Sequence, residues 1–216
     1  MNLIHTTLIH KIIVPKYKSS NKPPAIIMLH GRGADENDLI SLAPYLDERL
    51  FIISARAPFP FSYSNGYTWF EIEDIGKPDS KMFADSYQKL IQFIDDVRKS
   101  YPIDQEKIFL FGFSMGTMMS YAVVLTQPSW IKGVVANSGI IPEGSGLKYQ
   151  WDQIKGKPFF VGHGINDSII PIAFAKRAKE LLENAGAQIT YREYQMDHQI
   201  DEESLGDVIK WFDKQL

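Results

Sequence analysis

The stretch FLFGFSMGTMMSYA, residues 109–122, changes character at its centre. Its start belongs to an apolar run at 107–111 that is typical of a buried strand, whereas residues 115–126 have helical character. Between them, residues 112–116 match the pattern G-x-S-x-G around Ser114. A sharp strand-to-helix turn holds such a serine in a strained conformation, and the flanking glycines relieve a steric clash. An ordinary turn is the alternative, but this position in the chain favours an exposed nucleophile.

Strands and helices are expected to alternate along the rest of the chain. Short apolar runs predict strands at residues 3–14, 25–29, 50–54, 107–111, 133–136, 158–162 and 189–194. Apolar residues at helical spacing predict helices at residues 36–48, 80–100, 115–126, 172–184 and 205–216. This alternation is typical of an α/β fold in which helices cover both faces of a mostly parallel sheet. Because no linker divides the chain, we expect one domain over residues 1–216, with ligands at the carboxyl ends of the strands.

The composition excludes several kinds of site. A hydrophobic share of 44% with 23% charged residues is that of an ordinary globular protein, and a net charge of -3 offers nucleic acid no basic surface. The lack of cysteine excludes disulfides, thiolate metal sites and a cysteine nucleophile. The first residues do not form a signal-peptide pattern, and no apolar run approaches the roughly 18 residues that span a bilayer. We therefore expect a cytoplasmic protein without stable membrane insertion.

A glycine-rich loop, His30-Gly31-Arg32-Gly33, follows the predicted strand at 25–29. Acyl transfer through a serine requires N–H donors that point at the developing oxyanion. Such a loop supplies one donor and the residue after the nucleophile supplies another, which indicates the backbone N–H groups of Arg32 and Met115. By itself the loop also fits a plain turn. A phosphate-binding loop is disfavoured, because the lysine followed by serine or threonine is absent.

An acid and a histidine follow two later strands. Asp167 comes after the strand at 158–162, where a carboxylate can orient a histidine, although a turn or a helix cap is the alternative role. His198 follows the strand at 189–194 and is the only histidine beyond Asp167. We expect His163 to be structural, and His5 and His10 to lie at the surface or at a sheet edge. The order serine, aspartate, histidine is that of α/β-hydrolases.

Four segments together carry a family resemblance: LHGRGADENDL (29–39), FGFSMG (111–116), HGINDSIIP (163–171) and YREYQMDHQI (191–200). They resemble the bacterial carboxylesterase branch of the phospholipase/carboxylesterase family, which is related to the acyl-protein thioesterases. The resemblance extends over residues 25–212. It implies a compact α/β-hydrolase fold without a separate lid domain, acting on small-molecule esters with short or medium acyl chains.

The resemblance also implies roles for individual residues. It makes Ser114 the nucleophile, Asp167 the acid and His198 the base, with the oxyanion donors at the N–H groups of Arg32 and Met115. Two positions depart from the family. Met115 stands where the family often has glutamine, which removes a polar contact at the pocket floor. Asp197 stands where the family often has glycine, and its charge next to His198 is expected to favour the protonated ring or a different loop conformation.

The acyl pocket is expected to involve an aromatic segment after the strand at 50–54. We predict that Trp69 and Phe70 form its walls together with Ile169. No cofactor or metal is expected, because H-x-x-x-H, H-E-x-x-H and G-x-G-x-x-G patterns are absent, and the protein is expected to be a monomer or a homodimer. A thioesterase or lysophospholipase acting on longer acyl chains is an alternative with the same residues. A non-catalytic binding module is a remote alternative, which predicts loss of the serine, aspartate or histidine.

Overall fold

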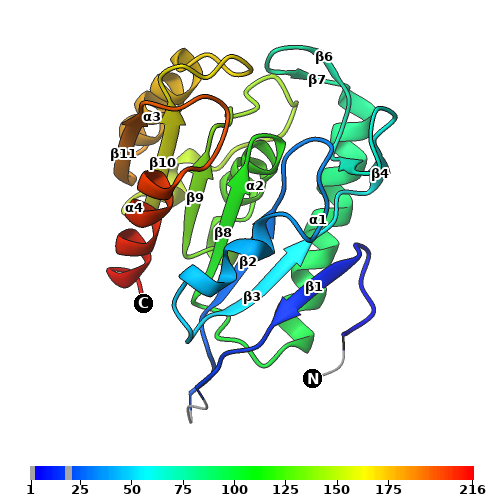
Figure 1. Cartoon of the computed structure of the whole chain (residues 1–216), viewed down its shortest axis with the longest axis vertical. Helices are drawn as coiled ribbons and strands as arrows, with labels where there is room; N and C mark the ends of the chain where they lie inside the picture. Colours follow the sequence, from blue (N-terminus) through cyan, green and yellow to red (C-terminus); the bar gives the residue numbers. More distant parts are fainter. Residues whose placement is uncertain (1–2, 18–20) are drawn as a thin grey trace.

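The computed structural model describes residues 3–17 and 21–216 and is built around a seven-stranded sheet (Figure 1). In spatial order its strands are β1 (His10–Ile13), β3 (Phe51–Ala55), β2 (Ala25–Leu29), β8 (Ile108–Phe113), β9 (Gly133–Asn137), β10 (Pro158–Gly164) and β11 (Gln188–Tyr194). Strand β1 runs antiparallel to β3, and every other neighbouring pair is parallel. The carboxyl ends of six strands therefore meet at one edge of the sheet.

Helices cover both faces of this sheet. The α-helices are α1 (Ser80–Ser100), α2 (Met115–Thr126), α3 (Ala173–Asn184) and α4 (Glu202–Asp213), and the 3-10 helices are η1 (Leu39–Tyr45), η2 (Pro128–Trp130) and η3 (Trp151–Ile154). Residues of α1, α2 and α3 pack with Ile27 in one apolar cluster, whereas residues of η1 and α4 pack with Ile26 and Met28 in another. Successive residues of a strand point to opposite faces, so β2 contributes to both clusters.

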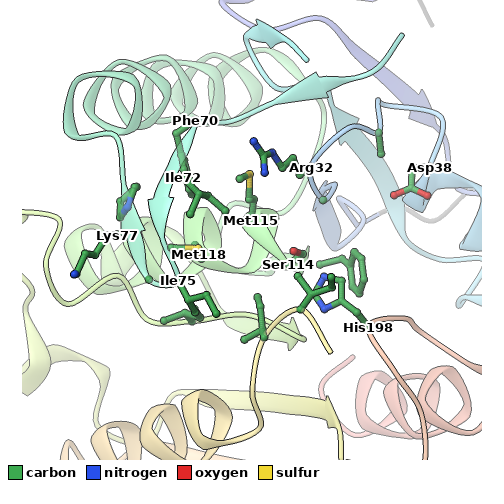
Figure 2. Close-up of a pocket in the computed structure, with 18 residues that line it drawn as sticks. Arg32, Asp38, Phe70, Ile72, Ile75, Lys77, Ser114, Met115, Met118 and His198 are labelled. Carbon is green, nitrogen blue, oxygen red and sulfur yellow. The ribbon is translucent and has the colours of Figure 1, made fainter. Parts of the chain in front are cut away.

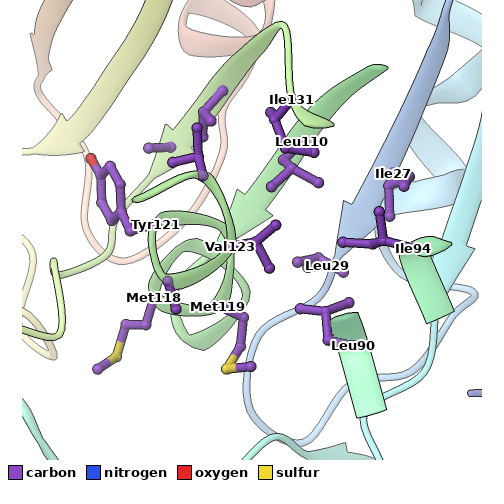
Figure 3. Close-up of a cluster of buried hydrophobic side chains, with 14 of the residues drawn as sticks. Ile27, Leu29, Leu90, Ile94, Leu110, Met118, Met119, Tyr121, Val123 and Ile131 are labelled. Atoms are coloured by element: carbon purple, nitrogen blue, oxygen red, sulfur yellow. The ribbon is translucent and has the colours of Figure 1, made fainter. Parts of the chain in front are cut away.

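The larger cluster surrounds α2 (Figure 3). Ile27 and Leu110 from the sheet face α2 on one side, and Leu90 and Ile94 of α1 lie on another. As a result, α2 is buried along its whole length. Close-packed interiors resist displacement of their side chains. The buried strand β8 and the buried helix α2 therefore fix both ends of the turn between them. Ser114 lies in that turn.

The predicted fold class is confirmed, and the strand at 25–29 and the helices at 80–100 and 115–126 have the predicted bounds. The strand predicted at 3–14 is wrong in length, because only His10–Ile13 pairs with β3. Residues 3–9 form no strand; the chain bends at residues 7 and 8, and the Thr6 hydroxyl donates to the Leu8 carbonyl. The helix predicted at 36–48 is only a short 3-10 turn, because Pro44 lacks the N–H that an α-helix requires there.

His10 lies at a sheet edge, which is one of the two expected positions, but its side chain is not at the surface. It lies on the edge strand β1, but it is only 5% exposed. Its Nε2 lies 2.6 Å from the Tyr101 hydroxyl, and its ring packs edge-on against Phe93. Contacts with Phe93 of α1 and with Tyr101, which follows α1, therefore bury the His10 side chain. The residues next to His10 in the sequence do not indicate this burial.

Two small sheets lie near the carboxyl edge of the large one and were not predicted. One pairs β4 (Phe59–Pro60) with β5 (Tyr67–Thr68), and the other pairs β6 (Ile72–Asp74) with β7 (Lys77–Pro78). In Figure 1, β6 and β7 form a hairpin above the ends of the central strands. Within the described part of the chain, no helix combines the length and the apolar character needed to cross a bilayer.

Candidate active site

Ser114 is the residue that joins β8 to α2, and its backbone is strained. Its φ is 55° and its ψ is -117°, a conformation that a side chain with a Cβ rarely adopts. The Ser114 N–H donates to the carbonyl of Asn137 on the neighbouring strand β9 over 3.0 Å. Its carbonyl accepts from Thr117 and Met118 in the first turn of α2. The surrounding structure therefore maintains the strain, as is common at functional sites.

The glycines on either side of Ser114 are required by close contacts with backbone. A Cβ on Gly112 would lie 2.5 Å from the backbone nitrogen of Thr117, in the first turn of α2. A Cβ on Gly116 would lie 1.8 Å from the carbonyl oxygen of Leu29 at the end of β2. Neither contact can be relieved by a side-chain rotation. The G-x-S-x-G spacing thus lets the helix start directly against two strand ends.

The predicted oxyanion donors lie on two segments that meet beside Ser114. Arg32 belongs to the loop after β2, and Met115 is the first residue of α2. Among the described contacts, neither backbone N–H donates to a protein acceptor. Both residues line the same cavity as Ser114. Free N–H groups at a helix start and in an adjoining loop are a suitable arrangement for a developing negative charge.

The loop that carries Arg32 is held in place by His30. The His30 Nδ1–H donates to the Gly31 carbonyl over 2.7 Å, while Nε2 accepts from the Ala57 N–H over 3.0 Å. The His30 carbonyl accepts from the indole N–H of Trp69 over 2.9 Å. Because the ring is fully buried and uses one nitrogen as an acceptor, it is held neutral, and burial lowers the pKa of His30.

Asp167 and His198 come from the loops after β10 and β11, and the structure brings them together. The His198 Nδ1–H donates to Asp167 Oδ2 over 2.8 Å. The other carboxylate oxygen accepts from the backbone N–H groups of Ile169 and Ile170, over 3.0 and 2.7 Å. The Asp167 side chain is fully buried, whereas that of His198 is 15% exposed. A buried carboxylate with this many donors keeps its orientation and sets the tautomer of the imidazole.

Ser114 and His198 line the same cavity, but the described contacts include no hydrogen bond between the serine hydroxyl and the ring. Instead, the ring of Phe113 packs against the imidazole with a centroid distance of 4.9 Å. Catalytic hydrogen bonds are often long before substrate binds, so this geometry leaves the proton transfer feasible.

His163 adds a further contact to Asp167. Its Nε2–H donates to the Ile170 carbonyl over 2.8 Å, and the same nitrogen lies 3.3 Å from Asp167 Oδ2. The ring is fully buried, and its Nδ1 has no partner among the described residues. Burial therefore lowers the pKa of His163. This histidine contacts Asp167 and does not line the cavity.

The Asp197 carboxylate accepts hydrogen bonds from two loops. It accepts from the backbone N–H and the hydroxyl of Ser168, over 2.7 and 2.9 Å, and from the backbone N–H of His198 over 2.8 Å. These hydrogen bonds lower the pKa of Asp197. They also tie the loop of His198 to the loop of Asp167, so Asp197 connects two parts of the site.

An apolar cavity of about 320 Å³ opens beside Ser114 (Figure 2). Phe70 and Ile169 line it as predicted residues of the pocket. The expectation for Trp69 is wrong, because its side chain is fully buried under the loop of His30 and does not face the cavity. Phe70 is also buried, but it lines the cavity, whereas the Trp69 indole donates to the His30 carbonyl outside it.

Further apolar side chains that were not predicted also line the cavity. They come from the β6–β7 hairpin, helix α2 and the loop after β9, namely Ile72, Ile75, Pro78, Met118 and Ile140. Figure 2 shows the hairpin residues and Met118 on the same side of Ser114 as Phe70. Met118 had a sequence signal, since it lies one helical turn after Ser114. The hairpin residues had none, because only the tertiary fold brings them over the strand ends.

The chain is similar to known proteins over nearly its whole length. Residues 10–216 match the sequence profile of the phospholipase/carboxylesterase family. The chain is 31% identical to acyl-protein thioesterase 1 of Candida albicans, over 93% of this chain and 95% of that protein. It is also 31% identical to acyl-protein thioesterase 1 of Debaryomyces hansenii, over 89% and 91%. The crystal structure of the Bacillus cereus carboxylesterase superposes with a TM-score of 0.85 at 26% identity, covering 97% of this chain and 95% of that one.

Proposed function

The chain belongs to the phospholipase/carboxylesterase family of hydrolases, and from this premise we propose that it cleaves carboxylic esters of short to medium acyl chains through Ser114, His198 and Asp167. One observation carries the proposal. A serine with a φ of 55° lines an apolar cavity together with a histidine whose Nδ1–H donates to a buried aspartate. A strained serine near an oriented histidine is the arrangement that activates a hydroxyl as a nucleophile.

The reaction proceeds in two steps. His198 Nε2 takes the Ser114 proton while Oγ attacks the ester carbonyl, and the N–H groups of Arg32 and Met115 stabilise the oxyanion. His198 then gives the proton to the departing alcohol as the acyl–oxygen bond breaks. In the second step His198 takes a proton from water, which attacks the acyl-enzyme, and returns it to Ser114. Asp167 holds the Nδ1–H and stabilises the imidazolium in both steps.

The cavity supports a short or medium acyl chain. Its volume of about 320 Å³ is at the small end of the range for ligand sites, and apolar side chains make up most of its walls. A second function is favoured by the relatives, two of which are named acyl-protein thioesterase 1. The oxyanion donors contact the carbonyl oxygen and not the leaving atom, so thioester hydrolysis uses the same residues. Lysophospholipase activity would require a longer acyl site.

A serine substitution tests the nucleophile. We expect Ser114→Ala to lower kcat for p-nitrophenyl butyrate by at least about 10³-fold and to abolish labelling by a fluorophosphonate. Ser120→Ala is the matched control, because it removes a hydroxyl from the same helix that donates to the Gly116 carbonyl and lies outside the cavity. Near-normal turnover by Ser114→Ala would refute the serine mechanism.

An ester series tests the acyl preference. Matched oxygen and sulfur esters of two to sixteen carbons would be compared by kcat/KM. We expect the highest kcat/KM with short or medium acyl chains, both for the oxygen esters and for the sulfur esters. A maximum at sixteen carbons would instead support the thioesterase or lysophospholipase alternative.

A further inference from the structure

Three charged side chains line the cavity beside Ser114 apart from His198, and they differ in whether a counter-ion is present. Arg32 forms an ion pair with Glu71, and Lys77 forms one with Asp74 at 3.3 Å. The Asp38 carboxylate has neither an ion pair nor a side-chain hydrogen bond within the described residues. The walls of the cavity therefore carry one uncompensated charge, and it is negative.

Asp38 lies on the opposite side of Ser114 from the apolar residues of the cavity. In Figure 2, Phe70, Ile72 and Met118 lie on one side of Ser114, and Asp38 lies on the other. An ester bound with its carbonyl carbon at Ser114 extends in two directions, with the acyl chain one way and the alcohol the other. With the acyl chain among apolar side chains, the alcohol points to the side of Asp38.

This side also continues into a second, polar hollow. Asp38 and Ala34 line both the cavity and the hollow, whose volume is about 440 Å³. The other residues of the hollow are Gly33, Asp35, Asn37, Ser64, Asn65 and Gly66. Carboxylate, amide and hydroxyl groups thus surround the path of the alcohol. This wall suits a leaving group that carries hydrogen-bond donors or a positive charge.

The cations nearby are committed to other partners. Arg56 pairs with Glu36, and Lys11 donates to the side-chain oxygen of Asn37 rather than to either carboxylate of the hollow. Asp35 accepts from the backbone and the side chain of Asn37. Desolvation and, second, repulsion from Asp35 raise the pKa of Asp38. A bound cation would offset both effects, because its charge stabilises the ionised carboxylate.

We propose that Asp38 forms a subsite for a positively charged leaving group, so that esters or thioesters of an ammonium-bearing alcohol or thiol are preferred substrates. The proposal rests on the proposed function, because it places the ester at Ser114. It assigns the apolar cavity to the acyl chain and the polar hollow to the ammonium group. The chemistry of the two steps is unchanged, since the charged group only positions the alcohol.

Two isosteric thioesters test the subsite. Butyrylthiocholine and S-(3,3-dimethylbutyl) thiobutyrate have the same shape and differ in the charge of one atom. We expect the protein to hydrolyse the cationic ester with a kcat/KM about fivefold to tenfold higher, as one partly solvated charge pair allows. In Asp38→Asn the ratio of the two values should fall to near one. Asp213→Asn, which changes the net charge equally at an exposed position on α4, should keep the ratio.

The outcomes separate this proposal from the proposed function. Equal kcat/KM values for the two thioesters, or an unchanged ratio in Asp38→Asn, would overturn the subsite while the hydrolase function stands. Lack of hydrolysis of both esters, together with no fluorophosphonate adduct on Ser114, would refute the proposed function itself. If Asp38→Asn fails to fold, the ratio in the unmodified protein decides, and 1 M NaCl should reduce it because salt screens the interaction.

Discussion

Acid is expected to destabilise the protein through three histidines that are buried in the neutral form. His10, His30 and His163 are 5% exposed or less, and desolvation lowers the pKa of each from the usual 6.5. Below pH 6.5 the unfolded chain binds protons that the folded protein does not. Stability is therefore fully present above pH 6.5 and is lost as the pH falls below it.

The size of the loss in unfolding free energy depends on how many histidines are buried in the neutral form. A histidine that titrates at 6.5 in the unfolded chain and stays neutral in the folded protein costs about 1.4 kcal/mol between pH 7.5 and 5.5. Three histidines cost at most about 4 kcal/mol, which is a large part of the 5–15 kcal/mol typical of whole proteins. Carboxyl groups with a lowered pKa act only below about pH 4.5. The raised pKa of Asp38 acts in the opposite sense, because protonation of that group favours the folded state.

Urea unfolding at several pH values between 7.5 and 5.5 measures this dependence. His163→Gln keeps an amide donor toward Ile170 and cannot titrate, so its loss of unfolding free energy over this range should be smaller by up to about 1.4 kcal/mol. His5→Gln is the control, because the side chain is exposed and its environment changes little on folding. An unfolding free energy that stays constant from pH 7.5 to 5.5, or equal slopes in all three proteins, would refute the reasoning.

Three further substitutions test the packing of the site. Gly116→Ala should prevent folding or cost more than about 4 kcal/mol, because its Cβ would overlap the Leu29 carbonyl; a soluble protein with near-normal urea stability would contradict this. Glu36→Ala should cost about 1–3 kcal/mol in the same assay, because the partly buried Arg56 guanidinium loses its carboxylate and keeps only the Tyr67 hydroxyl, and an unchanged unfolding free energy would contradict this. Phe70→Ala should shift the preferred ester to a longer acyl chain in a kcat/KM series, and an unmoved preference would remove it from the acyl pocket.

The fold class and the candidate residues could be predicted because they follow from local sequence patterns. Helical spacing along 80–100 and the buried run at 25–29 are properties of neighbouring residues, so these elements were predicted with their observed bounds. Because parallel strands end at one edge, the residues that follow the strands were expected to meet there. The Asp167–His198 contact has the geometry expected from this rule, while the roles of both residues stay predictions.

Other features depended on contacts that local patterns do not encode. Trp69 and Phe70 are adjacent and equally aromatic, and only the neighbouring loop of His30 decides that one is buried beneath it and the other reaches the cavity. The β6–β7 hairpin reaches the strand ends from a part of the chain with no strong periodicity.

The sequence by itself determined the α/β class, the sharp turn at Ser114 and the order of serine, aspartate and histidine, because each depends on residue types a few positions apart. The tertiary structure decided which side chains form the cavity and which charge on its walls lacks a partner. Those properties depend on side chains from distant segments, whose burial and pairing are set by long-range packing. The apolar cavity and the unpaired Asp38 are therefore features around Ser114 that only the tertiary structure shows.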